Sequence, residues 1–432
     1  MKRLVEKKLL DWKNSRDRKP LIIYGARQIG KTYSMLDFGN NNYDNLVYCN
    51  FESSIELYKI FDIDFNVNRI IASLSALYGV RINKKTTLII FDEIQACEKA
   101  LTSLKYFCED APEYHIIAAG SLLGLAVNRG HFSFPVGKVD MITMYPLTFE
   151  EFLMATNNEQ LIHLIKDSYD SMIQFPLHEK AMELYRTYLV IGGYPAVVKE
   201  YIELDNADYN RIRSIQSNIS SAYIADIAKY STTNNTIKTM EIYNTLHSQL
   251  AKENSKFQYA VINSRARAKD YENSLFWLKT ANVILDCKRI TEGKCPISFY
   301  EDNNSFKIYY SDIGLLSLRM DMIPNSIIQN INISDKVRGI LAESYVAQEL
   351  VSMGFSLHYW TSNNTAEVDF VIQKNDSAIP VEVKSSDNVR ARSLSMYIKN
   401  YNPNYAIRIS SKNFGFENNI KSIPLYAVFC LK

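Results

Sequence analysis

One stretch constrains the fold of this chain more than any other: residues 21–32, an apolar run followed by a loop framed by glycines. Gly25 and Gly30 enclose four residues and are followed directly by Lys31 and Thr32, the spacing G-x-x-x-x-G-K-[ST]. Two glycines allow a tight turn whose N–H groups surround phosphate oxygens, and the following helix adds the positive end of its dipole. The sequence therefore predicts a loop that binds the phosphates of ATP or GTP.

Each residue of this loop has an expected part in the site. Lys31 would reach the β- and γ-phosphates, and the Thr32 hydroxyl would hold Mg²⁺. An ordinary glycine-rich turn is the alternative, but the apolar run before the loop and the helical stretch 33–38 after it disfavour that reading. The residues expected to contact the nucleotide are Gly25, Ala26, Arg27, Gln28, Ile29, Gly30, Lys31, Thr32 and Tyr33.

A second signature lies 60 residues beyond Thr32, where the apolar run 86–91 ends in Asp92 and Glu93. Asp92 would hold Mg²⁺ directly or through water, and Glu93 would polarise the water that attacks the γ-phosphate. Ser121 follows another strand-like run and is a candidate sensor of the γ-phosphate, with a simple turn serine as the alternative. Strands alternating with helices predict an α/β fold with a doubly wound, mostly parallel sheet that binds ligands beyond its carboxyl edge.

Composition narrows the class of protein. The chain has 432 residues, of which 47% are hydrophobic, and this is enough for about two to four folded domains. Its 49 Lys and Arg nearly balance 47 Asp and Glu, so a nucleic-acid surface would have to be local. The six cysteines form no C-x-x-C pair and no metal-ligand spacing with the six histidines. Without a secretion signal or an apolar run of about 18 residues, we expect a cytoplasmic protein with no membrane segment.

Five motifs belong together: Gly25–Thr32, Phe91-Asp92-Glu93-Ile94-Gln95, Gly120-Ser121, Pro146–Phe152 and Gly192-Gly193-Tyr194-Pro195. As a set they resemble a known family, the prokaryotic AAA-type ATPases that carry a C-terminal domain of unknown function with a nuclease-like fold. The resemblance covers nearly the whole chain and implies ATP rather than GTP. Where such proteins commonly show Gly-Arg, this chain has Gly137-Lys138, and a lysine lacks the planar fork of an arginine finger. Arg129 is the substitute candidate for that role.

Patterns and resemblance together predict four domains. An AAA-type P-loop core would span 1–153, a helical lid 154–235, a winged helix 236–335 and a PD-(D/E)xK nuclease-like, restriction-endonuclease-like α/β domain 336–432. Within the lid, residues 192–195 are expected to form a turn between two core helices rather than a hinge.

The winged helix is predicted from the order helix, strand, turn, strand. Placing its basic face in a DNA groove is one interpretation. A packing or oligomerisation module is the other, because acidic residues are interspersed at 270, 272 and 292. The basic residues expected on the helix are Arg265, Arg267, Lys269 and Lys279.

The last region carries the second chemical signature. Asp369, twelve intervening residues and then Glu382-x-Lys384 span a predicted hairpin. Period two places Glu382 and Lys384 on one strand face, and Glu343 falls on an otherwise apolar helix face, where an acid needs a partner. This pattern resembles the PD-(D/E)xK nuclease core. The resemblance implies that Asp369 and Glu382 bind Mg²⁺, that Lys384 orients the attacking water or stabilises developing charge, and that Glu343 supports the site.

The sequence thus predicts a cytoplasmic ATPase that binds ATP or ADP with Mg²⁺, hydrolyses ATP, and acts on DNA through its winged helix and C-terminal domain. The alternative is a nucleotide-controlled switch or scaffold, associated with a toxin or with defence. It would bind a protein partner and would have no nuclease activity. A ring, a dimer and a monomer all stay open as assemblies.

Overall fold

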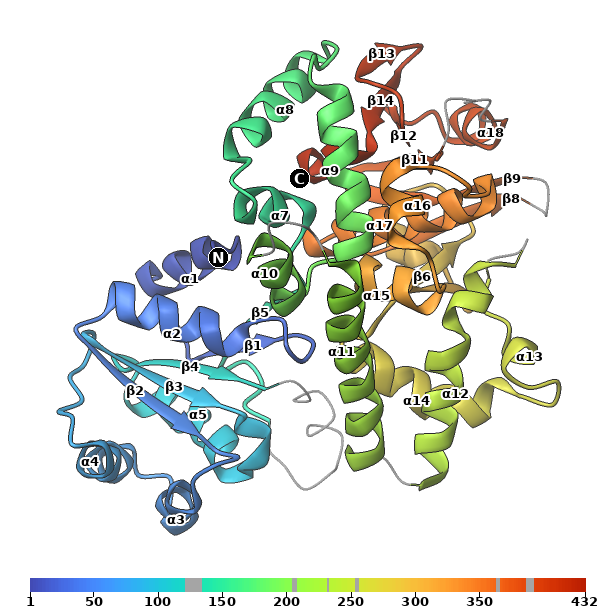
Figure 1. Cartoon of the computed structure of the whole chain (residues 1–432). Coiled ribbons are helices and arrows are strands. Elements are labelled where there is room, and N and C mark those ends of the chain that lie inside the picture. Colours follow the sequence, from blue (N-terminus) through green and yellow to red (C-terminus); the bar gives the residue numbers. More distant parts are fainter. Residues whose placement is uncertain (121–133, 204–207, 231–232, 253–255, 363–365, 386–391) are drawn as a thin grey trace. The chain divides into compact units, whose positions relative to one another are not determined.

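The structure is a computed structural model that describes residues 1–120, 134–203, 208–230, 233–252, 256–362, 366–385 and 392–432. The chain divides into two compact units, unit 1 (Met1–Tyr145) and unit 2 (Pro146–Lys432), which we treat separately (Figure 1). Ser121 and Arg129 lie outside the described residues, so their proposed roles stay predictions.

Unit 1 contains a five-stranded sheet in the order β2-β3-β4-β1-β5, and every neighbouring pair of strands is parallel. The strands are β1 (Leu21–Tyr24), β2 (Asn45–Asn50), β3 (Thr87–Asp92), β4 (His115–Ala119) and β5 (Asp140–Thr143). The helices are α1 (Val5–Asn14), α2 (Lys31–Asn42), α3 (Ile55–Ile63), α4 (Val67–Tyr78) and α5 (Glu98–Asp110), with a short 3₁₀ turn, η1 (Ile94–Ala96).

Helices cover both faces of this sheet, as expected for parallel strands that are buried on each side. One face, with Ile22, Ile89 and Ile116, forms a core with α3, α4 and α5, whereas α1 and α2 lie on the other side (Figure 1). On α2, a Cβ added to Gly39 would stand 2.6 Å from a methyl carbon of Leu46, so glycine lets the helix approach the sheet closely. The predicted doubly wound parallel sheet is confirmed.

Unit 2 begins with helices and ends with most of its strands. Its helices are α7 (Phe149–Ala155), α8 (Glu159–Ser171), α9 (His178–Ile191), α10 (Pro195–Glu203), α11 (Tyr209–Tyr230), α12 (Thr233–Leu250), α13 (Tyr259–Ile262), α14 (Ala268–Thr280), α15 (Ile313–Arg319), α16 (Pro324–Gln329), α17 (Asp335–Ser352) and α18 (Arg392–Tyr401). Its strands are β6 (Ile284–Ile290), β7 (Glu301–Tyr310), β8 (His358–Ser362), β9 (Ala366–Val368), β10 (Phe370–Lys374), β11 (Ser377–Val383), β12 (Ala406–Ser410), β13 (Gly415–Glu417) and β14 (Ile420–Pro424). Two 3₁₀ segments, η2 (Ile297–Tyr300) and η3 (Leu425–Leu431), complete it.

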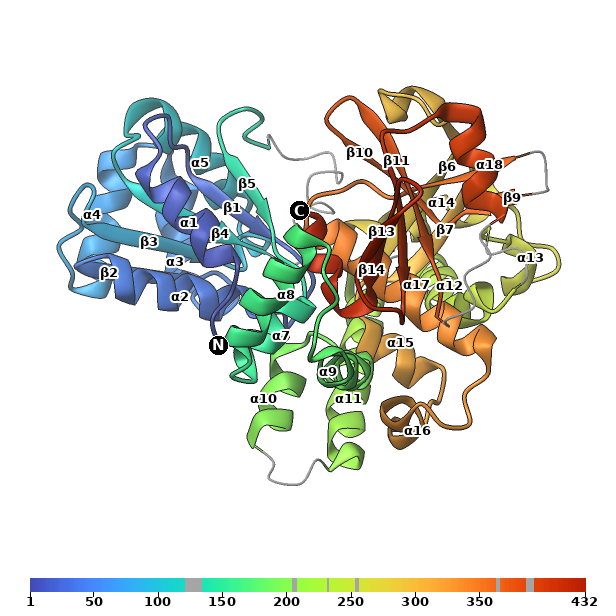
Figure 2. The same cartoon turned by 90° about the horizontal axis from the view of Figure 1, so that it is seen from above.

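The strands of unit 2 form two sheets, ordered β10-β11-β12-β14-β13 and β7-β6-β8-β9 (Figure 2). In the second sheet β6 pairs with β7 in antiparallel fashion and with β8 in parallel. The strands expected for a wing therefore share a sheet with β8 and β9, which come from the predicted nuclease-like region. Helix α14 begins at Ala268, so Arg265 and Arg267 precede it. The winged helix, the restriction-endonuclease-like fold and the four-domain division stay predictions.

The Gly-Gly-Tyr-Pro segment joins α9 to α10 in a tightly packed turn. The Gly193 N–H donates to Asp312 Oδ2 at 2.7 Å, and its carbonyl accepts from the Leu147 N–H at 2.6 Å. A Cβ at Gly193 would stand 2.1 Å from the Leu147 carbonyl oxygen, while Gly192 has a φ of +70°. Only glycine fits both positions, and the segment is a turn between core helices, as the sequence indicated.

Candidate functional site

The first candidate site lies where β1 runs into α2. Gly25 has a φ of +145°, and a Cβ there would meet the Met144 carbonyl oxygen at 2.2 Å. Gly30 has a φ of +90° and directly precedes Lys31, the first residue of α2. Both glycines thus hold backbone conformations that other residues rarely adopt. The loop between them ends at a helix N-terminus, whose first N–H groups have no acceptor within the helix and suit an anion.

The Lys31 side chain turns back into the loop. Its Nζ donates to the carbonyl oxygens of Gly25 and Ala26 at 2.9 and 2.7 Å, and only 8% of the residue is exposed. Burial lowers the pKa of Lys31 to about 8, although the negative charges of Glu93 and Asp92 oppose that shift. Neutral carbonyls compensate a buried ammonium only partly, so this lysine gains most from a ligand that carries negative charge.

Asp92 connects the two sequence signatures. It is the last residue of β3, and its Oδ2 accepts hydrogen bonds from Thr32 Oγ1 at 2.7 Å and from the Tyr48 hydroxyl at 2.8 Å. Tyr48 lies on β2, which pairs with β3 in a register that sets Asn50 beside Asp92. The structure therefore brings Thr32 and Asp92, the two predicted Mg²⁺ ligands of this unit, into direct contact.

Glu93 stands next to this pair in a strained conformation. Its φ is +51°, which is rare for a residue that is not glycine. Gln95 Nε2 donates to Glu93 Oε2 at 2.5 Å. Burial raises the pKa of Glu93, while the bond from Gln95 opposes that shift. A carboxylate whose pKa is raised by burial is a better proton acceptor, which suits the predicted role of a base toward water.

The other loop residues divide into buried and accessible ones. Ala26 and Ile29 are 1% and 0% exposed, whereas Tyr33, in the first turn of α2, is 57% exposed. Arg3, ahead of α1, donates to the carbonyl oxygens of Ile29 and Tyr145 at 2.8 and 2.7 Å. This arginine fixes the loop to the segment after β5, and its role was not foreseen from the sequence.

The second candidate site, which we call the acid cluster, lies in unit 2 and comprises Glu343, Glu367, Asp369 and Glu382 with two lysines. Asp369 sits between β9 and β10, and its Oδ2 accepts from the Val383 N–H at 2.7 Å. On β11, Glu382 Oε1 accepts from Lys384 Nζ at 2.6 Å. Burial and the neighbouring charges of Glu382 and Glu343 raise the pKa of Asp369 well above its usual range. The four residues predicted from the sequence thus lie close enough for their charges to interact: Glu343 on α17, Asp369, Glu382 and Lys384.

Lys307 on β7 is the second lysine of the acid cluster. Its side chain is 0% exposed, and Nζ lies 2.9 Å from Glu343 Oε1 and 2.6 Å from Glu367 Oε1. The Tyr309 hydroxyl also donates to Glu343 Oε1, at 2.5 Å. The neighbouring Lys307 charge and these hydrogen bonds hold the pKa of Glu343 below its usual value despite burial. Glu343 therefore has the partner that its position on an apolar helix face required.

The two sites differ in the oxygen ligands that they offer to a divalent cation. Among the described residues, no group of three or more His, Cys, Asp and Glu side chains is arranged to hold a metal ion. Mg²⁺ is commonly held by one or two protein oxygens together with water and substrate phosphates, and the hydroxyl of Thr32 beside the carboxylate of Asp92 fits that mode. In the acid cluster, Glu382 Oε2 is buried and has no hydrogen-bond partner in the described part of the chain, so an oxygen close to Asp369 is left for a ligand.

Tyr48, Gln95, Lys307, Tyr309 and Glu367 were missed as site residues. Lys307 and Tyr309 alternate on one face of β7, and a lysine among the aromatic and aliphatic residues of 306–310 was the signal that could have found them. Nothing local marks Tyr48, because its place beside Asp92 depends on the register between two strands.

Comparison with protein families gives a match with a described domain only over unit 1 and the first residues after it. Residues 17–153 match a family described as an AAA domain. Residues 182–325 and 338–428 match two families described as domains of unknown function, DUF8612 and DUF4143. Residues 17–153, which contain the phosphate loop and the parallel sheet of unit 1, are thus similar to AAA domains. The descriptions of the other two families name no activity.

Among solved structures, the chain is similar to the ORC2 protein of Aeropyrum pernix in its ADPNP and ADP complexes, with 13% identity, a TM-score of 0.32 and coverage of 75% of this chain and 91% of that one. It is also similar to RuvB, the Holliday junction branch migration motor of Thermotoga maritima, with 12% identity, a TM-score of 0.29 and coverage of 65% and 87%. The Aeropyrum pernix ORC1 protein in complex with DNA shows 11% identity, a TM-score of 0.28 and coverage of 78% of this chain and 90% of that one. We transfer no property across similarity of this degree. A search of curated proteins gave no match.

No helix among the described residues combines the length and the apolar character needed to cross a membrane.

Proposed function

We propose that this protein binds ATP with Mg²⁺ at the loop Gly25–Thr32 and hydrolyses it with Asp92 and Glu93. The observation that carries the proposal is the 2.7 Å hydrogen bond between Thr32 Oγ1 and Asp92 Oδ2, which joins the two separate signatures into one site. Thr32 and Asp92 would hold Mg²⁺, which when bound neutralises phosphate charge. The N–H groups of the loop and Lys31 bind the phosphates, and Glu93 takes the proton of the attacking water.

The contact between Glu93 and Gln95 adds a control step to this proposal. While Gln95 Nε2 donates to Glu93 Oε2, that oxygen is engaged and is a weaker base. Glu93 becomes a full base when the contact opens, and the strained backbone at Glu93 is consistent with a residue held for such a change.

Nucleotide binding is tested by titrating the full chain with Mg²⁺ and ATP in a calorimeter. Lys31→Ala removes the buried ammonium and should abolish binding while the thermal unfolding midpoint stays near that of the wild type. Lys59→Ala, at an exposed lysine on α3, is the matched control and should bind like the wild type. Equal binding by Lys31→Ala and the wild type would contradict the proposed site.

A second candidate function concerns the acid cluster, and the unpartnered buried oxygen Glu382 Oε2 favours it. We infer that Asp369 and Glu382 hold Mg²⁺ and that Lys384 orients water for attack on a phosphodiester of DNA. The test is cleavage of supercoiled and single-stranded DNA with Mg²⁺. Asp369→Ala should lose any cleavage, while Asp376→Ala, at an exposed turn between β10 and β11, should keep it. Absence of cleavage by the wild-type chain would reject the nuclease.

If the nuclease is rejected, the nucleotide-controlled switch or scaffold becomes the better description. The two are separated by the rate of ATP hydrolysis with and without duplex or single-stranded DNA. Stimulation by DNA supports an ATP-driven enzyme acting on DNA, and a rate that DNA leaves unchanged supports a switch that binds a protein partner. Binding to DNA thus belongs to the proposed enzyme, and binding to a protein partner belongs to the proposed switch. Self-association into a homo-oligomer is proposed for either.

A further inference from the structure

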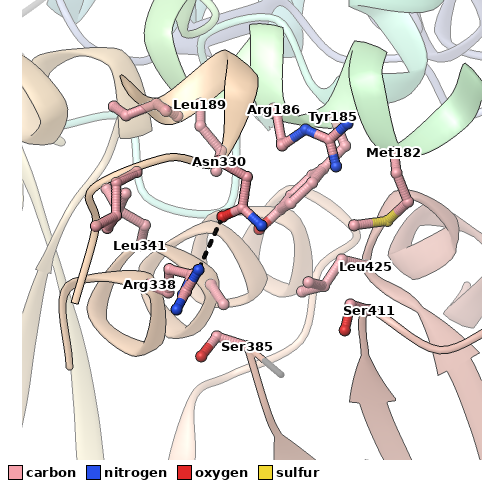
Figure 3. Close-up of a pocket in the computed structure, with 13 residues that line it drawn as sticks. Met182, Tyr185, Arg186, Leu189, Asn330, Arg338, Leu341, Ser385, Ser411 and Leu425 are labelled. Atoms are coloured by element: carbon pink, nitrogen blue, oxygen red, sulfur yellow. Dashed lines mark hydrogen bonds between the residues drawn. The ribbon is translucent and has the colours of Figure 1, made fainter. Parts of the chain in front are cut away.

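A cavity of about 270 Å³ in unit 2 has a lining that neither proposed reaction uses (Figure 3). It lies beside α9 and α17 and beyond the carboxyl ends of the parallel strands β11 and β12, where Ser385 and Ser411 are found. Ligands of α/β proteins commonly bind beyond this edge of a parallel sheet. The position of the cavity therefore suits a binding site.

The charge of the cavity wall is positive. Two arginines line it, Arg186 from α9 and Arg338 from α17, and none of the described residues in the lining is acidic (Figure 3). Arg338 is partly neutralised, because its Nη2 lies 2.7 Å from Asp335 outside the cavity, and its Nη1 donates to Asn330 Oδ1. Arg186 forms no ion pair with any described residue, and its one hydrogen bond there runs from Nε to the Ile328 carbonyl at 2.9 Å. Its charge is thus left for an external anion.

Neutral donors accompany the arginines. Tyr185 is 3% exposed, and within the described part of the chain neither its hydroxyl nor that of Ser385 makes a hydrogen bond. Burial raises the pKa of Tyr185, so the phenol keeps its proton and stays a donor. Both hydroxyls can therefore donate to a ligand in the cavity, beside a guanidinium that forms no ion pair with a described residue.

The rest of the wall is apolar. Aliphatic side chains from α9, α16, α17 and η3 share the lining with the polar groups, and they suit the hydrocarbon part of a ligand rather than a free inorganic ion. These residues are Met182, Leu189, Ile327, Leu341 and Leu425.

We propose that this cavity binds a small organic oxyanion, a phosphate monoester or a carboxylate with an apolar or aromatic body. The guanidinium of Arg186 holds the oxyanion in its planar fork, with Arg338, Tyr185 and Ser385 as further donors. The aliphatic wall holds the body. The inference goes beyond the ATPase and the nuclease and depends on neither.

The test is calorimetric titration of the full chain with four probes: phenyl phosphate, benzoate, benzyl alcohol and inorganic phosphate. The three organic probes share a ring and differ in the head group, while inorganic phosphate lacks the ring. The proposal expects one of the two organic anions to bind with one site per chain and more tightly than either benzyl alcohol or inorganic phosphate. Whichever anion binds better identifies the head group. Equal binding of benzyl alcohol and both anions would overturn the proposal.

Variants locate the site. Arg186→Gln should lower the affinity for the tighter-binding anion about tenfold or more, the loss expected for one charge-assisted hydrogen bond. Arg211→Gln, at an exposed arginine paired with Glu200 on the same unit, should leave affinity unchanged. The Ser385 hydroxyl makes no hydrogen bond to a described residue, so Ser385→Ala should fold normally and weaken binding several-fold, which keeps the test decisive if Arg186→Gln fails to fold. Binding lost in Lys31→Ala but kept in both cavity variants would assign the probe to the phosphate loop and overturn the proposal.

Discussion

Lys307 offers the sharpest test of the charge balance in the acid cluster. Lys307→Met keeps the aliphatic stem of a fully buried side chain but removes the ammonium that lies 2.9 Å from Glu343 and 2.6 Å from Glu367. Two carboxylates would then face each other without a cation between them. Removing one partner of a buried ion pair costs about 3–5 kcal/mol. The Glu367 side chain is 37% exposed and partly screened by water, so we expect the lower end, about 3 kcal/mol.

The assay is urea unfolding monitored by hydrogen exchange of peptides from α17 and β7, which reports on unit 2 alone. Lys288→Met is the matched control, since Lys288 lies on the neighbouring strand β6 and pairs with Glu301, but its side chain is 38% exposed. That exposed pair should contribute less than about 1 kcal/mol. Combining Lys307→Met with Glu343→Gln and Glu367→Gln removes the repulsion and should recover more than half of the lost stability.

Two results would refute this reasoning. The first is a Lys307→Met variant within about 1 kcal/mol of the wild type, which would mean that the ammonium does not balance the buried carboxylates. The second is a triple variant no more stable than Lys307→Met, which would assign the loss to packing rather than charge.

Three further predictions follow from single contacts. Tyr48→Phe removes a donor from Asp92 Oδ2, so the Mg²⁺ concentration for half-maximal ATP hydrolysis should fall about three- to tenfold, and an unchanged Mg²⁺ dependence would exclude this role. Burial raises the pKa of Glu349 to about 8, so the folded state holds a proton that the unfolded state releases above about pH 4.5. The free energy of unfolding should therefore fall by roughly 5 kcal/mol as the pH rises from about 4.5 to 8. Glu349→Gln should abolish this loss, as measured by urea unfolding at about pH 5 and pH 8.5. Gly193→Ala places a Cβ 2.1 Å from the Leu147 carbonyl oxygen and should cost about 3 kcal/mol or more, whereas Gly339→Ala on α17, with nothing within 4 Å, should be neutral or stabilising in the same thermal melts.

The part of the site that sequence predicted rests on local rules. The phosphate loop was predictable because Gly25 and Gly30 adopt positive φ values, and Lys31 must follow at once where the helix begins. Asp92 and Glu93 were predictable because a buried strand that ends in acids places them at the carboxyl edge of a parallel sheet. In these cases the chemistry needs a fixed spacing along the chain.

The residues that sequence missed depend on pairing between distant strands. Lys307 contacts Glu343 and Glu367, which lie 36 and 60 positions further along the chain. Lys307 itself belongs to a segment that the sequence assigned to another domain. The parallel pairing of β6 with β8 creates this neighbourhood, and neither strand carries a local mark of its partner. Tyr48 shows the same limit on a smaller scale. Its hydroxyl meets Asp92 only because of the register of β2 on β3.

The role of Glu93 in hydrolysis is the central claim, and single-turnover hydrolysis by Glu93→Gln tests it most directly. Radiolabelled ATP is mixed with an excess of the 432-residue chain and Mg²⁺, and bound ATP and ADP are counted over time. Glu98→Gln, at an exposed glutamate on α5, is the control and should turn over like the wild type. The account predicts that Glu93→Gln binds ATP as the wild type does and retains it uncleaved, with a rate reduced about a hundredfold or more. Hydrolysis by Glu93→Gln at the wild-type rate would contradict the account.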